Sequence, residues 1–239
     1  MSSENILALA GLAMLFAMLM SSTLLFLRFN PRERDRSSVV HILVMDAMIL
    51  AIILIMTFVP NMGFLMVIPT VTLTLLHLPV LLGAAIGGWK KGLLYGLLFG
   101  LASWIKALTA ATSAFDLMFI YPWCAVLPRA LFGLIAGLAF SFLDRVSHKG
   151  KKVLYLTSAS AVCTLVHTGL VFLDLYIFFP KEVAALFQYE AAGWTFLAIV
   201  GVGALGEALL AALLIPALYM AVSAATPMLL AKRKKKPLR

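Results

Sequence analysis

The sequence predicts an all-α integral membrane protein, a bundle of six transmembrane helices with one extra helix before it. Three observations lead to this fold class. Of the 239 residues, 63% are hydrophobic and only 12% are charged, whereas about a quarter of the residues of a soluble domain are charged. Apolar runs of about 20 residues, enough to span the hydrocarbon layer as a helix, recur along the chain. Alternating ten-residue strands of the barrel type are missing from the sequence, which favours helical spans.

Seven apolar segments are predicted to span the membrane. The first, residues 5–27, is too long for a signal peptide and lacks the basic flank before it, so we expect it to remain as a helix. The seven predicted spans are 5–27, 40–59, 70–89, 92–106, 121–143, 153–179 and 195–225. They divide the chain into an N-terminal helix with a basic linker (1–39), a six-helix domain (40–225) and a basic tail (226–239).

The positions of the basic residues predict how the chain is oriented. Sixteen of the 19 Lys and Arg residues fall in four short clusters, in every second loop. Cytoplasmic loops carry such an excess of Lys and Arg, so we expect the N-terminus outside and the C-terminus in the cytoplasm. The net charge of +9 is therefore assigned to anchoring in a lipid bilayer, not to nucleic acid. The clusters are Arg28 to Arg36, Lys90 and Lys91, Arg145 to Lys152, and Lys232 to Arg239.

Ionisable residues inside the predicted spans are candidates for binding a solute, because a charge in a bilayer is costly unless it is paired or hydrated. Arg129 either offers its planar fork to an anionic solute from outside or forms a structural ion pair with Glu207 or Asp174. Both acids are themselves candidates, since their depths bracket that of the arginine. His77 and His167 lie on otherwise apolar helices, where a histidine either contacts a ligand or is a hydrogen-bonded core residue.

The three outer connections contain more aromatic residues than loops in water need. They are PNMGFLMVIPT (60–70), ALTAATSAFDLMFIY (107–121) and PKEVAALFQYEAAGW (180–194). Their aromatic side chains form either a belt at the membrane interface or an apolar lid over a small molecule. The candidates for contacting such a molecule are Asn61, Tyr121 and Trp123, with Asp116 and Gln188 as further polar candidates.

The sequence carries no signal for an enzyme, a metal or a cofactor. Cys124 and Cys163 lie in apolar runs without metal or redox spacing, so we interpret both as core residues. GVGALG (201–206) matches the dinucleotide fingerprint formally but lies within an apolar helix, where its glycines favour close helix packing. The chain has no G-x-x-x-x-G-K-[ST], G-x-S-x-G or H-E-x-x-H motif. It is therefore not expected to hydrolyse ATP or to be an enzyme.

The stretch HILVMDAMILAIILIMTFVP (41–60) places an aspartate beside two small residues. Ala47 and Ala51 are one turn apart and leave a shallow groove on one helix face, which allows another helix to approach closely. The groove either receives a partner protein or packs against a neighbouring span of the same chain. Asp46 is expected near the inner interface, as a hydrated neighbour or a polar rim contact for the partner and not as a buried charge.

Three motifs, in order along the chain, resemble those of the substrate-binding S components of energy-coupling-factor (ECF) vitamin transporters. AMILA (47–51) fits the Ala-x-x-x-Ala motif of the family's first helix. LHLPVLLGAAIGGWKKGLLYGLLFGLASW (76–104) resembles its H-x-P-V hairpin, and VLPRALFGLIAGL (126–138) resembles its P-R helix. The resemblance covers residues 40–225; most members lack a leading span such as 5–27.

This resemblance implies a subunit of an importer in the bacterial plasma membrane. Such a subunit binds a water-soluble vitamin under its outer loops and docks through the alanine motif on a coupling membrane subunit (the T component) with two cytoplasmic ATPases. It then topples, so that its pocket opens inward. Arg129 slightly favours a carboxylate such as pantothenate, while riboflavin and folate stay open. The alternatives are a membrane scaffold protein of envelope synthesis and an intramembrane enzyme.

Overall fold

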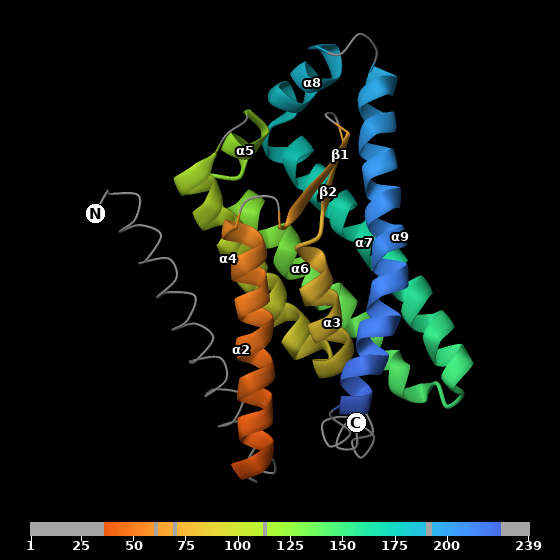
Figure 1. The fold of residues 1–239 in the computed structure, drawn as a ribbon. Coiled ribbons are helices and arrows are strands. Elements are labelled where there is room, and N and C mark those ends of the chain that lie inside the picture. Colours follow the sequence, from red (N-terminus) through yellow and green to blue (C-terminus); the bar gives the residue numbers. More distant parts are fainter. Residues whose placement is uncertain (1–35, 60–61, 69–70, 112–113, 190–192, 226–239) are drawn as a thin grey trace.

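The computed structural model describes residues 36–59, 62–68, 71–111, 114–189 and 193–225. The first predicted span, Asn61 and the basic tail lie outside the described residues. Within the described ranges the helices form a bundle (Figure 1), and four of them are long and apolar enough to cross a membrane. These four are Trp89–Ala110, Pro122–Ser141, Lys149–Phe178 and Val200–Ala225. The prediction of a helical membrane protein is confirmed.

Six helices build the bundle and correspond to the second to seventh predicted spans. They are α2 (Arg36–Phe58), α3 (His77–Gly87), α4 (Trp89–Ala110), α6 (Pro122–Ser141), α7 (Lys149–Phe178) and α9 (Gly193–Ala225). Two short helices, α5 (Ala114–Met118) and α8 (Pro180–Tyr189), lie in the second and third outer connections. Figure 1 shows both at one end of the bundle. A 3-10 turn (Phe142–Arg145) follows α6.

The predicted helix at 70–89 is wrong in its first part. Val71–Thr74 form strand β2, which pairs antiparallel with β1 (Phe64–Ile68), and α3 begins only at His77. The β-branched residues of VTLT favour an extended backbone. With 11 residues, α3 is about 16 Å long and crosses about half of the hydrocarbon layer. The hairpin continues from α3 toward the end that carries α5 and α8 (Figure 1).

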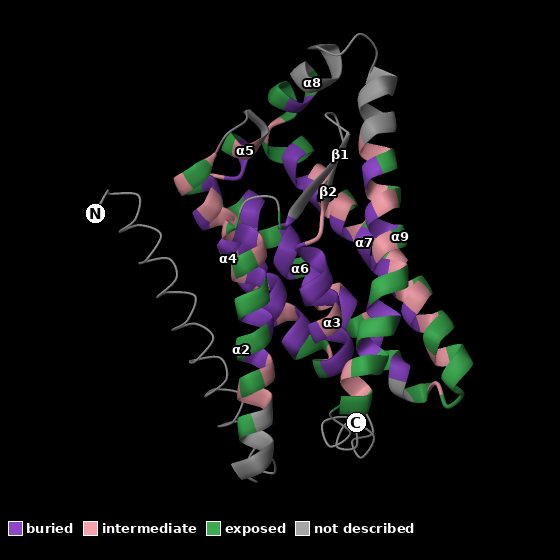
Figure 2. Ribbon diagram, in the orientation of Figure 1, coloured by how far each residue is buried: buried purple, intermediate pink, exposed green. Residues whose placement is uncertain are grey.

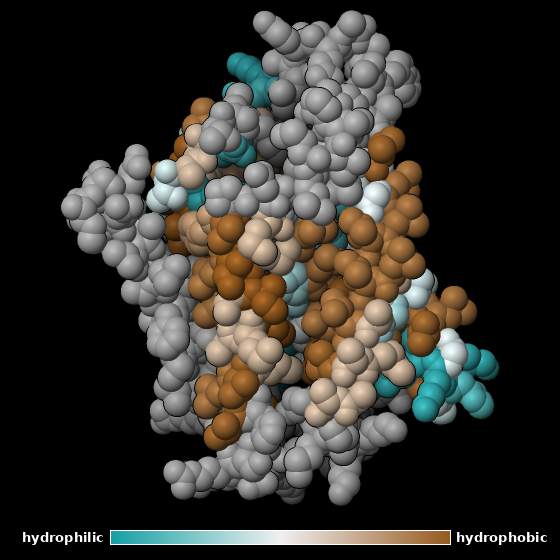
Figure 3. Space-filling model, viewed as in Figure 1, coloured by the Kyte–Doolittle hydropathy of each residue, from teal (hydrophilic) through white to brown (hydrophobic). Residues whose placement is uncertain are grey.

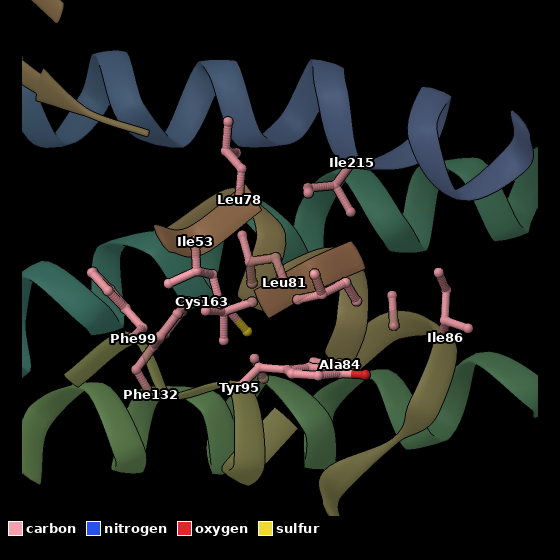
Figure 4. Close-up of a cluster of buried hydrophobic side chains, with 14 of the residues drawn as sticks. Ile53, Leu78, Leu81, Ala84, Ile86, Tyr95, Phe99, Phe132, Cys163 and Ile215 are labelled. Atoms are coloured by element: carbon pink, nitrogen blue, oxygen red, sulfur yellow. The ribbon is translucent and has the colours of Figure 1, made fainter. Parts of the chain in front are cut away.

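The core lies between α3, α4 and α6 and the inner faces of α2, α7 and α9. Figure 2 shows buried residues gathered on these inner faces. Figure 4 shows apolar side chains converging there, among them Ile53, Leu81, Phe99, Phe132 and Ile215. On the face that Figure 3 shows, the described surface is also largely hydrophobic, apart from hydrophilic residues where α7 begins and at the end that carries α5 and α8. An apolar exterior around a packed core is expected of a bundle surrounded by lipid.

Helices α4 and α6 pack backbone against backbone because glycines line their contact. A Cβ on Gly96 would overlap the carbonyl group of Arg129, and a Cβ on Gly133 would overlap the facing backbone of α4. Small residues of this kind allow helices in lipid to approach closely. The glycines therefore fix the depth and direction from which the side chain of Arg129 enters the bundle.

We expect Gly133→Val to lower the stability of the protein by about 1–3 kcal/mol, because the added methyl groups would force α4 and α6 apart. Gly169→Val on α7 is the matched control, since nothing lies within 4 Å of a Cβ built on Gly169. Thermal unfolding in detergent measures the difference. Equal midpoints for the two variants would contradict close packing at Gly133.

The prediction that Asp46 is a hydrated interfacial residue is wrong. Its side chain is fully buried. It forms an ion pair with Lys91 and accepts a hydrogen bond from the hydroxyl group of Tyr95. Lys91 was assigned to a basic cytoplasmic loop, but α4 already begins at Trp89 and carries Lys91 inward. Gly88 makes the turn before it possible, with a left-handed φ of 75° that favours glycine.

Candidate functional site

Three helices bring four of the predicted site residues together inside the bundle. His77 is the first residue of α3, Arg129 lies in the middle of α6, and His167 and Asp174 lie two turns apart on α7. All four side chains are buried, with at most 8% of their surface exposed. Buried polar groups within apolar helices are costly unless they are satisfied, so their partners decide what the cluster can do.

Pro128 determines where the side chain of Arg129 goes. A proline has no N–H group, so the carbonyl four residues earlier, that of Cys124, loses its helical partner. The Nη1 atom of Arg129 donates a hydrogen bond to this carbonyl at 2.8 Å. The guanidinium group also lies 4.5 Å from the ring centre of Phe119. Its Nε atom is buried and has no hydrogen-bond partner in the described part of the chain.

The two histidines continue this cluster toward α3. The rings of His77 and His167 stack with their centres 6.0 Å apart, and the ring of Phe132 lies 4.7 Å from that of His167. Phe99 joins the histidines to the arginine, since its ring lies 5.8 Å from His167 and 5.9 Å from the guanidinium of Arg129. Neither ring nitrogen of His167 has a hydrogen-bond partner among the described residues, whereas the imidazole of His77 lies close enough to the backbone of Thr74 to interact with it. Both interpretations of the histidines, ligand contact and core residue, therefore stay open at this point.

The two acidic candidates have different surroundings. Asp174 is close enough to Arg129 and Cys124 to interact with both electrostatically, and its Oδ2 atom is buried without a hydrogen-bond partner within the described ranges. Glu207 on α9 instead accepts a hydrogen bond from the backbone N–H of Thr74 at 2.6 Å. This contact satisfies an N–H at the end of β2. No ion pair joins Arg129 to either acid in the described residues.

Tyr121 and Trp123 lie at the start of α6, away from the histidines. Each is 44% exposed. Their rings contact each other at 5.1 Å, and they contact Phe179 and Phe178 at the end of α7. This position fits the aromatic belt at the membrane interface. Of the further polar candidates, Asp116 is half-buried on α5, and the side chain of Gln188 lies outside the described side chains.

Three phenylalanines that surround the polar cluster were not among the predicted site residues. Phe119 follows α5 in the second outer connection, and its ring covers the guanidinium of Arg129. The aromatic content of that connection was the signal for it. Phe99 and Phe132 gave no signal, because they lie in long apolar spans where most phenylalanines face lipid. In the described residues, no group of three or more His, Cys, Asp or Glu side chains could hold a metal ion.

The family to which the chain belongs follows from a comparison with known proteins. Residues 41–219 match the family described as the substrate-specific component of ECF transporters. The chain belongs to this family, the S components. The resemblance of the three motifs is thereby confirmed.

This S component is similar to two proteins that are named as transporters. The chain is 28% identical over 207 residues to the pantothenic acid transporter PanT of Lactococcus lactis subsp. cremoris, a match that covers 81% of this chain and 97% of the relative. It is 29% identical over 158 residues to the pantothenate transporter PanT of Leuconostoc mesenteroides subsp. mesenteroides, covering 64% of this chain and 78% of that protein. Both names describe transporters.

The S component exposes the alanine motif on α2. Ala47 and Ala51 are both exposed, and no described helix covers them. The large apolar side chains around them are exposed as well, including Met48 at 60% and Ile55 at 48%. We call the face formed by Val44, Ala47, Met48, Ala51, Ile52 and Ile55 the α2 outer face. It is apolar, with two small residues at its centre, and it is not covered by any other helix of the described part of the chain.

Proposed function

We propose that this S component binds pantothenate from the outer side of the membrane and releases it inward after docking on a coupling membrane subunit with two ATPases. One observation carries the choice of substrate: Arg129 is buried among aromatic rings, and its Nε donor has no hydrogen-bond partner among the residues that the structure describes. A guanidinium matches a carboxylate in shape and charge. The names of the two relatives support the same vitamin.

The rest of the cluster suits the rest of pantothenate, which has an amide, two hydroxyl groups and two methyl groups. The amide and hydroxyl groups need both donors and acceptors. His77 and His167 add imidazole rings, a group that can both donate and accept hydrogen bonds, and the Oδ2 atom of Asp174 is an acceptor. The methyl groups would meet the rings of Phe99 and Phe132. A largely apolar enclosure with a few placed polar groups is typical of small-molecule sites.

Docking is assigned to the α2 outer face. Ala47 and Ala51 allow a helix of the coupling subunit to approach α2 closely. The basic clusters, such as Lys149 to Lys152 at the start of α7, support an orientation in which that end faces the cytoplasm. The ATPases would then lie on the same side as these clusters, and α5, α8 and the hairpin would face the outside.

Binding of vitamins to the purified protein tests this proposal. We expect calorimetry in detergent to show saturable binding of pantothenate and none of riboflavin or folate. Pantothenol, in which an alcohol replaces the carboxylate, should bind about 100-fold more weakly, because it offers Arg129 no charge. Equal affinity for pantothenate and pantothenol would remove the proposed role of the carboxylate. Binding of none of these compounds would overturn the transport function for pantothenate.

A further inference from the structure

Helix α2 is apolar on all sides, so hydrophobicity alone does not determine which side faces outward. Its buried side carries Ile49, Leu50 and Ile53, and its exposed side carries residues of the same kinds, such as Met48 and Ile55. A helix takes its rotation from hydrophobic patterning only when its faces differ. In lipid, exchanging one apolar face for another changes the free energy little, because lipid tails are as apolar as leucine. Some other feature must fix the rotation of α2.

The buried side of α2 contains one charged residue, Asp46. One carboxylate oxygen, Oδ2, pairs with the ammonium group of Lys91, and the other, Oδ1, accepts a hydrogen bond from the hydroxyl group of Tyr95. Lys91 and Tyr95 are one turn apart on α4, so both reach the same point of α2. Asp46 and Tyr95 are fully buried, and Lys91 is 5% exposed. Both oxygens of the carboxylate are therefore used.

Two glycines on α3 leave room for the side chains of Tyr95 and Lys91. A Cβ on Gly83 would overlap the ring of Tyr95, and a Cβ on Gly87 would overlap the side chain of Lys91. The two glycines are one turn apart, as are the two side chains that they admit. Four positions on α3 and α4 thus serve a single carboxylate on α2. This arrangement is unlike the contact of α4 with α6, where glycines bring two backbones together.

We propose that the cluster of Asp46, Lys91 and Tyr95 is a positioning device that fixes the rotation of α2 about its axis and so presents Ala47 and Ala51 outward. A turn of α2 by one residue, about 100°, would break both the ion pair with Lys91 and the hydrogen bond from Tyr95, and losing such contacts between buried polar groups is costly. Fixing the register of a helix is the best-attested role of buried polar groups. The consequence for transport rests on the proposed docking through the α2 outer face; the rotation itself does not.

The test replaces the whole cluster with apolar residues of similar size: Asp46→Leu, Lys91→Met and Tyr95→Phe together. Removing all three groups leaves no charge unpaired, so the variant should fold. A spin label on Ala51→Cys reports the rotation of α2, with Cys124 and Cys163 replaced by alanine and the label on Leu165→Cys of α7 as control. A loss of stability alone would not change the spectrum of the label at position 51 as long as the protein is folded.

With the native cluster, we expect a single spectrum of a mobile label at position 51. In the triple variant a second, immobilised component should appear there, while the spectrum at position 165 stays the same. If the outer face is presented only a tenth of the time, the apparent affinity for the coupling subunit and its ATPases falls about tenfold. Pantothenate affinity should change less than about twofold, because the proposed binding residues around Arg129 do not lie on α2. The rotation of α2 therefore does not change how often these residues are available to the ligand.

An unchanged spectrum at position 51 in the triple variant would overturn the proposal, whatever happens to docking. A changed spectrum with unchanged docking would support the rotational role and would instead remove the docking function from the α2 outer face. Should the triple variant fail to fold, Tyr95→Phe alone, which removes one of the two bonds to Asp46, is measured in the same way. A wild-type spectrum and wild-type docking in that variant would overturn the proposal.

Discussion

Replacing Arg129 by glutamine is expected to weaken pantothenate binding by about 30-fold or more, because losing one partner of a buried charge pair costs about 2–5 kcal/mol. The free Nε of Arg129 is the only charged donor that the buried cluster offers within the described residues. Glutamine is shorter and neutral, and it still offers an amide to the carbonyl group of Cys124. Calorimetry of the purified variant measures the affinity.

The comparison with pantothenol makes this prediction specific. The variant should bind pantothenol about as well as the native protein does, so its preference for the carboxylate disappears. Arg145→Gln is the matched control, since Arg145 is exposed in the turn after α6 and should affect neither ligand. If the variant loses pantothenol and pantothenate alike, Arg129 holds the fold and does not recognise the carboxylate.

The helices and the polar residues of the buried cluster could be predicted because each depends on local sequence. Apolar length gave the spans, and the rarity of charges within them singled out Arg129 and Asp174. The pairing of Pro128 with Arg129 also has a local cause, since the proline frees the carbonyl that the arginine binds. Such features need no knowledge of how distant segments pack.

The features that could not be predicted depend on contacts between distant segments. Asp46 lies 45 positions before Lys91. Its depth in the membrane could be estimated from its position along the helix, but the sequence did not show which side of the helix faces the bundle. Glu207 and Thr74 are 133 positions apart, so the local sequence did not show that the carboxylate of Glu207 accepts a hydrogen bond from the backbone of β2. The hairpin was hidden because an apolar strand and an apolar helix have the same hydropathy.

Rotation also bears on the two alternatives for the alanine motif. A groove at Ala47 and Ala51 could be predicted from the one-turn spacing, but not whether it faces this chain or a partner. Among the described helices, α2 contacts α3 and α4 and directs both alanines away from them. None of the described helices fills the groove, and the remaining prediction tests the proposal that a partner does.

Ala51→Trp is expected to abolish association with the coupling subunit and its ATPases while leaving pantothenate binding within about twofold of the native value. Helices associate in lipid through close packing at small residues, and an indole at position 51 would hold the partner helix away. The side chain at position 51 points out of the bundle, so the indole can be accommodated without moving the core. Co-purification of the assembled complex measures association, and calorimetry of the free subunit measures binding.

Ala47→Trp should have the same effect, since Ala47 and Ala51 lie on one face. Leu165→Trp on α7 is the matched control: Leu165 is also exposed to lipid, but it is far from the α2 outer face in the fold, so association should persist. Loss of pantothenate binding together with association in either alanine variant would mean that the alanines pack the protein itself. Association that survives both substitutions would mean that the coupling subunit binds another face, and the exposed groove on α2 would then be a lipid contact.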